Sequence, residues 1–143
     1  MSEENKAIVR HIFEEVWGAH DANKVDRYFA ANFVNYPELP GAPQGSAGIK
    51  AQVRMYASAL SDNHQVIEDL FAEGDKVAVR WSATGRQTGE FAGIPATGKQ
   101  FKTTAITIYR FKDGKVVQGW TEYNSLEMMQ QLGVVPQPAP VAG

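Results

Sequence analysis

The stretch TTAITIYRFKDGKVVQGWTEYN, residues 103–124, decides the fold of this chain. Apolar and polar residues alternate on both sides of Asp113-Gly114, and such a pair between two alternating runs is a strong signal for a two-residue hairpin turn. We therefore predict antiparallel strands over 101–111 and 115–124, with Lys112 paired to Lys115. One long hairpin of this kind places the second half of the chain in a sheet.

The register of this hairpin predicts which side chains share a face. Counting outward from the turn gives four facing pairs on one face: Tyr109 with Gln118, Thr107 with Trp120, Ala105 with Glu122, and Thr103 with Asn124. Small residues, an indole and a few polar groups together are typical of a pocket wall. We therefore predict an enclosed pocket for a hydrophobic small molecule, with Trp120, Thr107 and Tyr109 among its binding residues.

Outward from the hairpin, the chain divides into a helical first part and a strand-rich second part. Apolar residues first recur at steps of three and four, which predicts three helices, over 3–18, 24–31 and 46–60. Alternation then predicts two further strands, over 64–72 and 77–87, and a last helix follows over 125–132. Proline and glycine mark two loops, at 37–45 and 89–99. Helices first and antiparallel strands afterwards indicate the α+β class.

Length and composition limit the function classes. The 143 residues fit one domain, which we expect over 1–133, with a flexible tail over 134–143. A formal net charge of −2 argues against a nucleic-acid partner. No apolar run approaches the ~20 residues of a membrane span, so we expect no membrane partner and a cytoplasmic location. Cysteine is absent and the three histidines lack metal-ligand spacing, so neither thiolate chemistry nor a metal site is expected.

Four motifs carry a family resemblance. They are GEFAGIPATGKQF (89–101), IYRFKDGKVVQGW (108–120), MMQQLG (128–133) and, near the start, FEEVWGAHDANKVDRYFAANFVNYPE (13–38). Together they resemble the SnoaL-like polyketide cyclase (ester cyclase) family, over the chain as far as Gly133. The resemblance implies the cone-shaped nuclear transport factor 2-like fold, often as a homodimer, and chemistry on polyketide-like ligands without a cofactor.

The resemblance also implies a set of reactive positions, from which this chain departs. In the cyclases an aspartate four residues past the tryptophan acts as general acid and base in an aldol ring closure, and histidines frequently occupy the positions of Gln87 and Tyr36. Here Asn124 stands four residues past Trp120. An amide can hold and polarise a carbonyl but cannot exchange a proton, whereas a positioned acid or base typically contributes ~10²–10⁴-fold in rate.

These departures leave Glu122 as the only carboxylate on the predicted pocket face. We predict it as the proton carrier, with Asn124, Gln87 and Tyr36 orienting ligand oxygens. The alternatives are a solvated or arginine-paired Glu122, and amides that satisfy buried backbone groups. Three functions stay open: a cofactor-free cyclase or isomerase for a hydrophobic carbonyl compound, a non-catalytic small-molecule-binding domain, and a cofactor-free hydroxylase or epoxide-opening enzyme.

Overall fold

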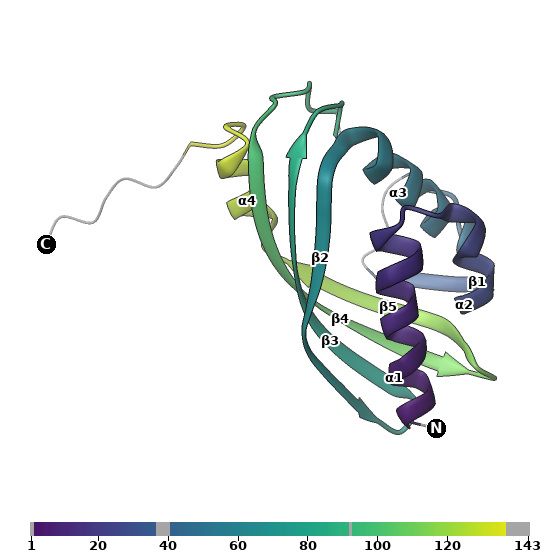
Figure 1. Ribbon diagram of the computed structural model, residues 1–143. Coiled ribbons are helices and arrows are strands. Elements are labelled where there is room, and N and C mark those ends of the chain that lie inside the picture. Colours follow the sequence, from purple (N-terminus) through teal and green to yellow (C-terminus); the bar gives the residue numbers. More distant parts are fainter. Residues whose placement is uncertain (1, 37–40, 92, 137–143) are drawn as a thin grey trace, which may run out of the picture.

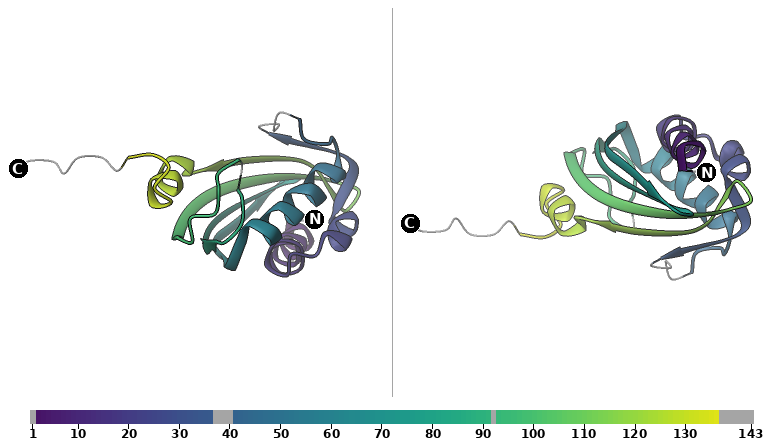
Figure 2. Two further views of the ribbon diagram at one scale, coloured as in Figure 1. Left: turned by 90° about the horizontal axis from the view of Figure 1, so that it is seen from above. Right: turned by 90° about the horizontal axis from the view of Figure 1, so that it is seen from below.

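The second half of the chain forms a bent sheet, and the N-terminal helices lie on its concave side (Figure 1, Figure 2). The computed structural model describes residues 2–36, 41–91 and 93–136, so parts of the predicted loop 37–45 and of the predicted tail 134–143 lie outside the described residues. The strand order is β1-β5-β4-β3-β2, with β1 parallel to β5 and the other neighbours antiparallel. The predicted α+β class is confirmed.

The strands of the second half lie where the alternation predicts them and extend slightly further. They are β2 (Leu60–Glu73), β3 (Lys76–Gln87), β4 (Gln100–Lys112) and β5 (Lys115–Tyr123). Asp113 and Gly114 have φ angles of 53° and 79°, the left-handed values that a type I′ turn requires. Lys112 pairs with Lys115. The hairpin is therefore confirmed at its turn.

Close to this turn the register of the hairpin changes. Phe111 pairs with Val116 whereas Arg110 pairs with Gln118, so Val117 is an extra residue that forms a β-bulge. Every later partner is displaced by one residue: Thr107 faces Thr121, Ala105 faces Tyr123, Ile108 faces Trp120, and Ile106 faces Glu122. The predicted pairs beyond the bulge are wrong, because one inserted residue exchanges the two faces of β5.

Gly119 explains why the extra residue is accommodated here. Gly119 faces Tyr109 on β4, and a Cβ atom at this glycine would lie 3.0 Å from the Phe33 ring and 3.3 Å from the Tyr109 ring. Only a glycine fits beneath these two rings on the inner face. In the predicted register the longer side chain of Gln118 would occupy that position.

The first predicted helix is present, with a change of winding. α1 (Ser2–His11) continues into a π-helical segment over Ile12–Gly18, which is more widely wound than an α-helix. Val9, Ile12 and Val16 are fully buried at steps of three and four, as the sequence pattern predicts. This helical segment therefore packs its apolar stripe on the sheet.

The second predicted helix is shorter than the sequence indicates. A 3-10 turn (Ala22–Lys24) leads into α2 (Val25–Tyr28), and β1 (Phe29–Tyr36) begins where the helix was expected to continue. Phe29 and Phe33 are both buried. Val25, Tyr28 and Phe29 recur at helical steps, which predicts a helix as far as residue 31, but the chain becomes extended at Phe29.

Two apolar clusters fix the helices to the sheet. The larger joins α1, β1 and α3 (Ser46–Ala59) to the sheet through residues that include Val9, Phe29, Val53, Val79 and Phe111. The smaller joins the end of α3 to α4 (Ser125–Gln131) through Ala59, Leu60, Phe91, Phe101, Met128 and Leu132. Between them, the inward residues of β4 over 103–107 belong to neither cluster. This middle zone is where a ligand site must be sought.

The end of the described chain folds back on α4. Gly133 has a φ of 80° and ends the helix, and the Val134 N–H donates to the Met129 carbonyl at 3.0 Å.

Among the helices of the described segments, none combines the length and the apolar character needed to cross a membrane.

Candidate functional site

The inner face between the two clusters carries hydroxyl groups in place of large apolar side chains. Thr107 Oγ1 accepts a hydrogen bond from the Trp81 indole N–H at 3.0 Å and shares another with Thr121 Oγ1 at 2.9 Å. Tyr123 lies two residues beyond Thr121 on the same face and opposite Ala105. Thr103, Ala105 and Thr107, the inward residues of β4 in this zone, are small and buried, and the Thr107 hydroxyl is engaged by Trp81 and Thr121.

Two further tyrosines extend this surface. Burial raises the pKa of Tyr109 to about 12, and a hydrogen bond from Trp17 opposes this shift. Burial, followed by the neighbouring Tyr123, raises the pKa of Tyr56 on α3 to about 12. Both phenols are therefore protonated at neutral pH and can donate hydrogen bonds. We call Tyr56, Thr107, Tyr109, Thr121 and Tyr123 the inner-face hydroxyls.

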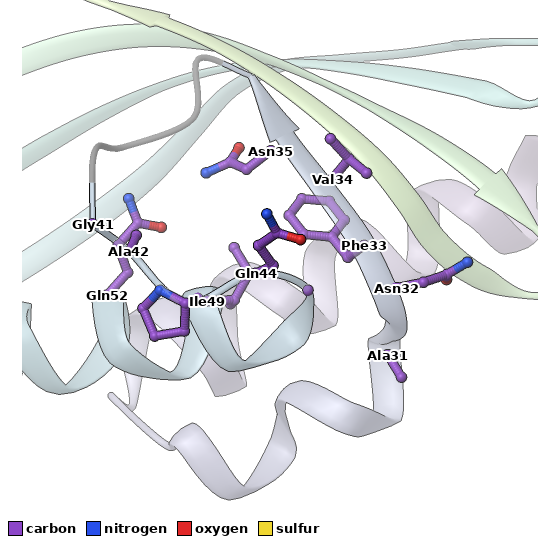
Figure 3. Close-up of a pocket in the computed structure, with 13 residues that line it drawn as sticks. Ala31, Asn32, Phe33, Val34, Asn35, Gly41, Ala42, Gln44, Ile49 and Gln52 are labelled. Carbon is purple, nitrogen blue, oxygen red and sulfur yellow. The ribbon is translucent and has the colours of Figure 1, made fainter.

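A cavity of about 600 Å³ opens between β1 and the start of α3, a volume within the usual range for small-molecule sites. Figure 3 shows the amide side chains of Asn35, Gln44 and Gln52 around this space, together with the Phe33 ring. Among the residues that the structure describes, those that line the cavity carry no charged side chain: they are Ala31, Asn32, Phe33, Val34, Asn35, Gly41, Ala42, Pro43, Gln44, Gly45, Gly48, Ile49 and Gln52. The cavity therefore suits an uncharged ligand with several hydrogen-bonding groups.

The cavity and the inner-face hydroxyls share two elements of the fold. Gln52 lines the cavity and lies one helical turn before Tyr56 on α3, so both side chains lie on the same side of the helix. Asn35 also lines it and pairs with Gly119, and Thr121 follows Gly119 two residues later on the same face of β5. None of the inner-face hydroxyls is among the described residues that line the cavity.

The inner face is electrically neutral. All positions of β3, β4 and β5 are described, and their inward side chains include no Asp or Glu. Neutral phenols can stabilise a carbonyl or enolate oxygen by donating hydrogen bonds, because such donors need no charge of their own. The arrangement can hold and polarise oxygens, and it offers no carboxylate on these strands for proton transfer.

Two of the predicted binding residues lie where the sequence places them. Thr107 and Tyr109 are buried on the inner face of β4. Trp120 does not join them: because of the bulge it lies on the outer face, stacked on Tyr36 with ring centroids 5.5 Å apart and with Lys76 Nζ 5.8 Å from its centroid. The predicted placement of Trp120 and Tyr36 at the pocket is therefore corrected.

Glu122 also lies on the outer face, for the same reason. It is exposed and faces Ile106, which is itself 50% exposed. The predicted desolvation beside an indole is absent, since the Trp120 ring lies against Tyr36 on a surface open to water. Its placement on the pocket face is corrected to the outer surface.

Asn124 is exposed and begins α4. Its Oδ1 accepts a hydrogen bond from the Glu127 backbone N–H at 3.1 Å, and its Nδ2 donates to Glu127 Oε2 at 2.8 Å. This reciprocal arrangement is a helix N-cap. Both ends of the amide are thus engaged by α4, although the residue stands at the position of the family's aspartate.

Gln87 is fully buried, and its side chain holds the loop that follows β3. Its Nε2 donates to the carbonyls of Ile94 and Pro95, each at 3.1 Å, and its Oε1 accepts from the Thr97 hydroxyl at 2.8 Å. These contacts match the alternative of satisfying buried groups. A ligand role for Gln87 stays a prediction.

Sequence reasoning missed Thr121 and Tyr123 as inner residues. The signal that could have found them is weak: Val116 and Val117 are adjacent apolar residues, which break the alternation of β5 and leave its phase open.

Three aromatic rings pack together on the helical side of the site. The ring centroids of Trp17 and Tyr56 lie 6.0 Å apart, edge to face, and those of Tyr56 and Phe91 also lie 6.0 Å apart. These rings form an aromatic wall opposite the sheet.

A bent, mostly antiparallel sheet with N-terminal helices on its concave side and a hydroxyl-bearing inner face defines a cone-shaped α+β domain of the nuclear transport factor 2-like class. A model of the SnoaL-like polyketide cyclase family matches residues 7–132. The chain therefore belongs to the SnoaL-like polyketide cyclase family.

Individual relatives agree with this membership. The chain is 31% identical to aklanonic acid methyl ester cyclase DnrD of Streptomyces peucetius, over 93% of this chain and 92% of that protein. Among solved structures it is similar to TsrD of Streptomyces laurentii, with a TM-score of 0.86 and 30% identity over 93% of this chain and 97% of that one. AclR of Streptomyces galilaeus, a candidate hydroxylase, gives a TM-score of 0.83 at 26% identity over 97% and 87% of the two chains.

Proposed function

We propose that this protein binds a polyketide-like carbonyl compound against the inner-face hydroxyls and promotes its ring closure without a cofactor. The observation that carries the proposal is the hydroxyl-bearing inner face, whose inward side chains on β3, β4 and β5 include no Asp or Glu, together with a cavity of about 600 Å³ whose described lining residues are uncharged. Such a surface suits an uncharged substrate rich in carbonyl groups. Relatives named as aklanonic acid methyl ester cyclases support the reaction class.

The proposed reaction is an intramolecular aldol closure. A carbon beside one carbonyl loses a proton and forms a bond to a second carbonyl carbon, whose oxygen gains a proton, so substrate and product are isomers. Hydrogens between two carbonyl groups are already acidic, so holding the chain in a folded shape and stabilising the enolate oxygen can supply much of the acceleration. Tyr56 and Tyr109, as neutral donors, are the residues we propose for that stabilisation.

A proton-carrying role for Glu122 stays a prediction, and its exposed position opposite Ile106 does not favour it. Asn124 also stays a predicted ligand-orienting residue, and its exposed position does not favour that role either. Its engagement by Glu127 favours a second candidate function, a non-catalytic binding domain for the same class of compound. The two candidates share the site and differ in whether bound compound is converted.

The test uses aklanonic acid methyl ester, the compound that names two relatives. Ring closure predicts a product of unchanged mass and changed retention in liquid chromatography with mass spectrometry. Tyr109→Phe and Tyr56→Phe should lower turnover by ~10²-fold each. Tyr28→Phe is the matched control, because Tyr28 stacks on His11 away from the inner face. Tight binding without conversion would favour the non-catalytic function, and absence of binding would contradict both.

We also propose a homodimer formed through the outer face of the sheet. One row of apolar residues crosses all five strands there, in cross-strand register: Phe71, Ala78, Ile108, Trp120 and Tyr36. Phe71 is 66% exposed, and exposed apolar rows of this width are unusual on monomers. Light scattering after size exclusion should give twice the chain mass, and Ile108→Glu should give a monomer that stays folded. A monomeric wild-type protein would contradict the dimer.

A further inference from the structure

Gln65 occupies the inner face of β2, close to the proposed ligand site. It pairs with Ala83, which pairs with Thr103, and both of these are buried on the inner face. Ile67, the next inward residue of β2, pairs with Trp81, whose indole N–H donates to Thr107. Gln65 therefore lies one cross-strand row from the inner-face hydroxyls.

One end of the Gln65 amide is held in place from behind. Its Nε2 donates to Asn63 Oδ1 at 3.1 Å, and Asn63 Nδ2 lies 3.2 Å from His20 Nε2, which accepts in the tautomer protonated on Nδ1. Asn63 is 9% exposed and lies within a β-bulge between Ser61 and His64. Bulges often re-aim a side chain. Here the polar chain of His20, Asn63 and Gln65 runs from the turn after the first helix onto the sheet.

The other end of the amide is buried without a partner. Gln65 Oε1 accepts no hydrogen bond from any residue that the structure describes. A buried carbonyl oxygen in this condition is uncommon, because burial without a donor is unfavourable. Asn63 Nδ2 is directed at His20, so Asn63 presents its Oδ1 to Gln65, and the oxygen of the Gln65 amide is the end left free.

We propose that Gln65 is a ligand-binding residue that accepts a hydrogen bond from a hydroxyl group of the bound compound, with Asn63 as the positioning residue that fixes its amide. The inference rests on the proposed function, since it needs a ligand on the inner face. It adds the substrate class: a hydrophobic carbonyl compound that also carries a free hydroxyl at the end near β2. The inner-face hydroxyls would meet the carbonyl oxygens, and Gln65 would select the hydroxyl.

The experiment compares two probes, 2,6-dihydroxyanthraquinone and 2,6-dimethoxyanthraquinone, in the second of which a methyl group replaces the hydrogen of each hydroxyl. Binding is followed by quenching of tryptophan fluorescence, since Trp81 contacts the site through Thr107. The wild-type protein should prefer the dihydroxy compound by about tenfold, the effect of one good hydrogen bond. Gln65→Leu and Gln65→Met should abolish the preference. Gln118→Leu, on the outer face, is the matched amide control and should keep it.

Variants of Asn63 separate positioning from packing. Asn63→Leu removes the acceptor for Gln65 Nε2 and should remove most of the preference. Asn63→Asp keeps an acceptor in that place and should retain the preference. Circular dichroism on each variant verifies that it is folded.

The possible failures are distinguishable. If the wild-type protein binds both probes equally, or if Gln65→Leu keeps the preference, the role of Gln65 is overturned while the proposed binding function stands. If the wild-type protein binds neither probe, the proposed ligand site is overturned and the role of Gln65 with it.

Discussion

The inner and outer faces of the β4–β5 hairpin have the same backbone and opposite environments. On β4, Thr107 and Tyr109 are buried under the helices, while their neighbours Ile106 and Ile108 are exposed. On β5 the same division holds, but one inserted residue at Val117 decides which side chains fall on which side. Alternation therefore shows dependably which residues of a strand share a face. A single bulge decides which of the two groups points inward.

The largest expected difference between the faces is in packing. Phe33→Ala should lower the free energy of unfolding by about 3–5 kcal/mol, because Phe33 is 3% exposed and its ring packs against Phe29 and against Gly119. Phe71→Ala on the outer face should change it by less than about 0.5 kcal/mol in the monomer. Urea denaturation of both variants measures the contrast. Similar losses for the two would mean that the outer face is also buried.

A smaller effect is expected at the crowded point of β5. Gly119→Ala places a Cβ atom 3.0 Å from the Phe33 ring and should destabilise the protein by about 1–3 kcal/mol. Its neighbour Gln118 lies on the outer face, so Gln118→Ala should stay within about 0.5 kcal/mol. If the order of these two effects were reversed, residue 118 would be the inward one and the bulge would lie elsewhere.

Alkaline pH offers a graded test of burial. The pKa of Tyr109 is about 12 in the folded protein against about 10 when unfolded, so the unfolded state releases the proton first. The contribution of Tyr109 to the free energy of unfolding should be constant below about pH 10 and should fall as the pH rises from about 10 to about 12. Tyr109→Phe should reduce this fall by on the order of 1 kcal/mol. Thermal melts at several pH values measure it, and an unchanged slope in the variant would show that Tyr109 is not responsible.

The smallest effect is expected for Glu122→Gln. Because Glu122 is exposed opposite Ile106, the change should alter stability by less than about 0.5 kcal/mol and leave turnover of aklanonic acid methyl ester nearly unchanged. Rates measured across pH give the answer. A loss of turnover with intact binding would restore Glu122 as the proton carrier and would require a site that reaches the outer face.

Local sequence signals predicted those parts of the fold that depend on local geometry. Asp113-Gly114 predicted the turn because few residue pairs tolerate two left-handed conformations. The strands and helices followed from periodicity, except at Phe29, where the helical spacing of Val25, Tyr28 and Phe29 predicted a helix as far as residue 31. Here the pairing of β1 with β5, a long-range contact, decides the outcome.

The candidate site was less predictable than the fold. Thr107 and Tyr109 were placed correctly because β4 has no irregularity in its pairing with β3. Trp120 and Glu122 were misplaced because the bulge depends on the space beneath Phe33 and Tyr109, which is set by distant elements. Gln65 gave no signal, since its unpartnered oxygen follows from tertiary contacts with Asn63 and His20.

The backbone of Gln87 closes the base of the loop that follows β3. Its backbone N–H donates to the Lys99 carbonyl at 2.9 Å and its own carbonyl accepts from the Gly98 N–H at 2.8 Å, so the chain leaves and rejoins the sheet at one residue. The segment that follows is also tied to the end of α3, where the Thr88 and Gly89 N–H groups donate to the Ala59 carbonyl at 3.0 Å, and its Phe91 is buried in the smaller cluster. A change of length in this segment would therefore leave the strand pairing at its base intact, at low entropic cost, and would act on the packing between α3 and α4.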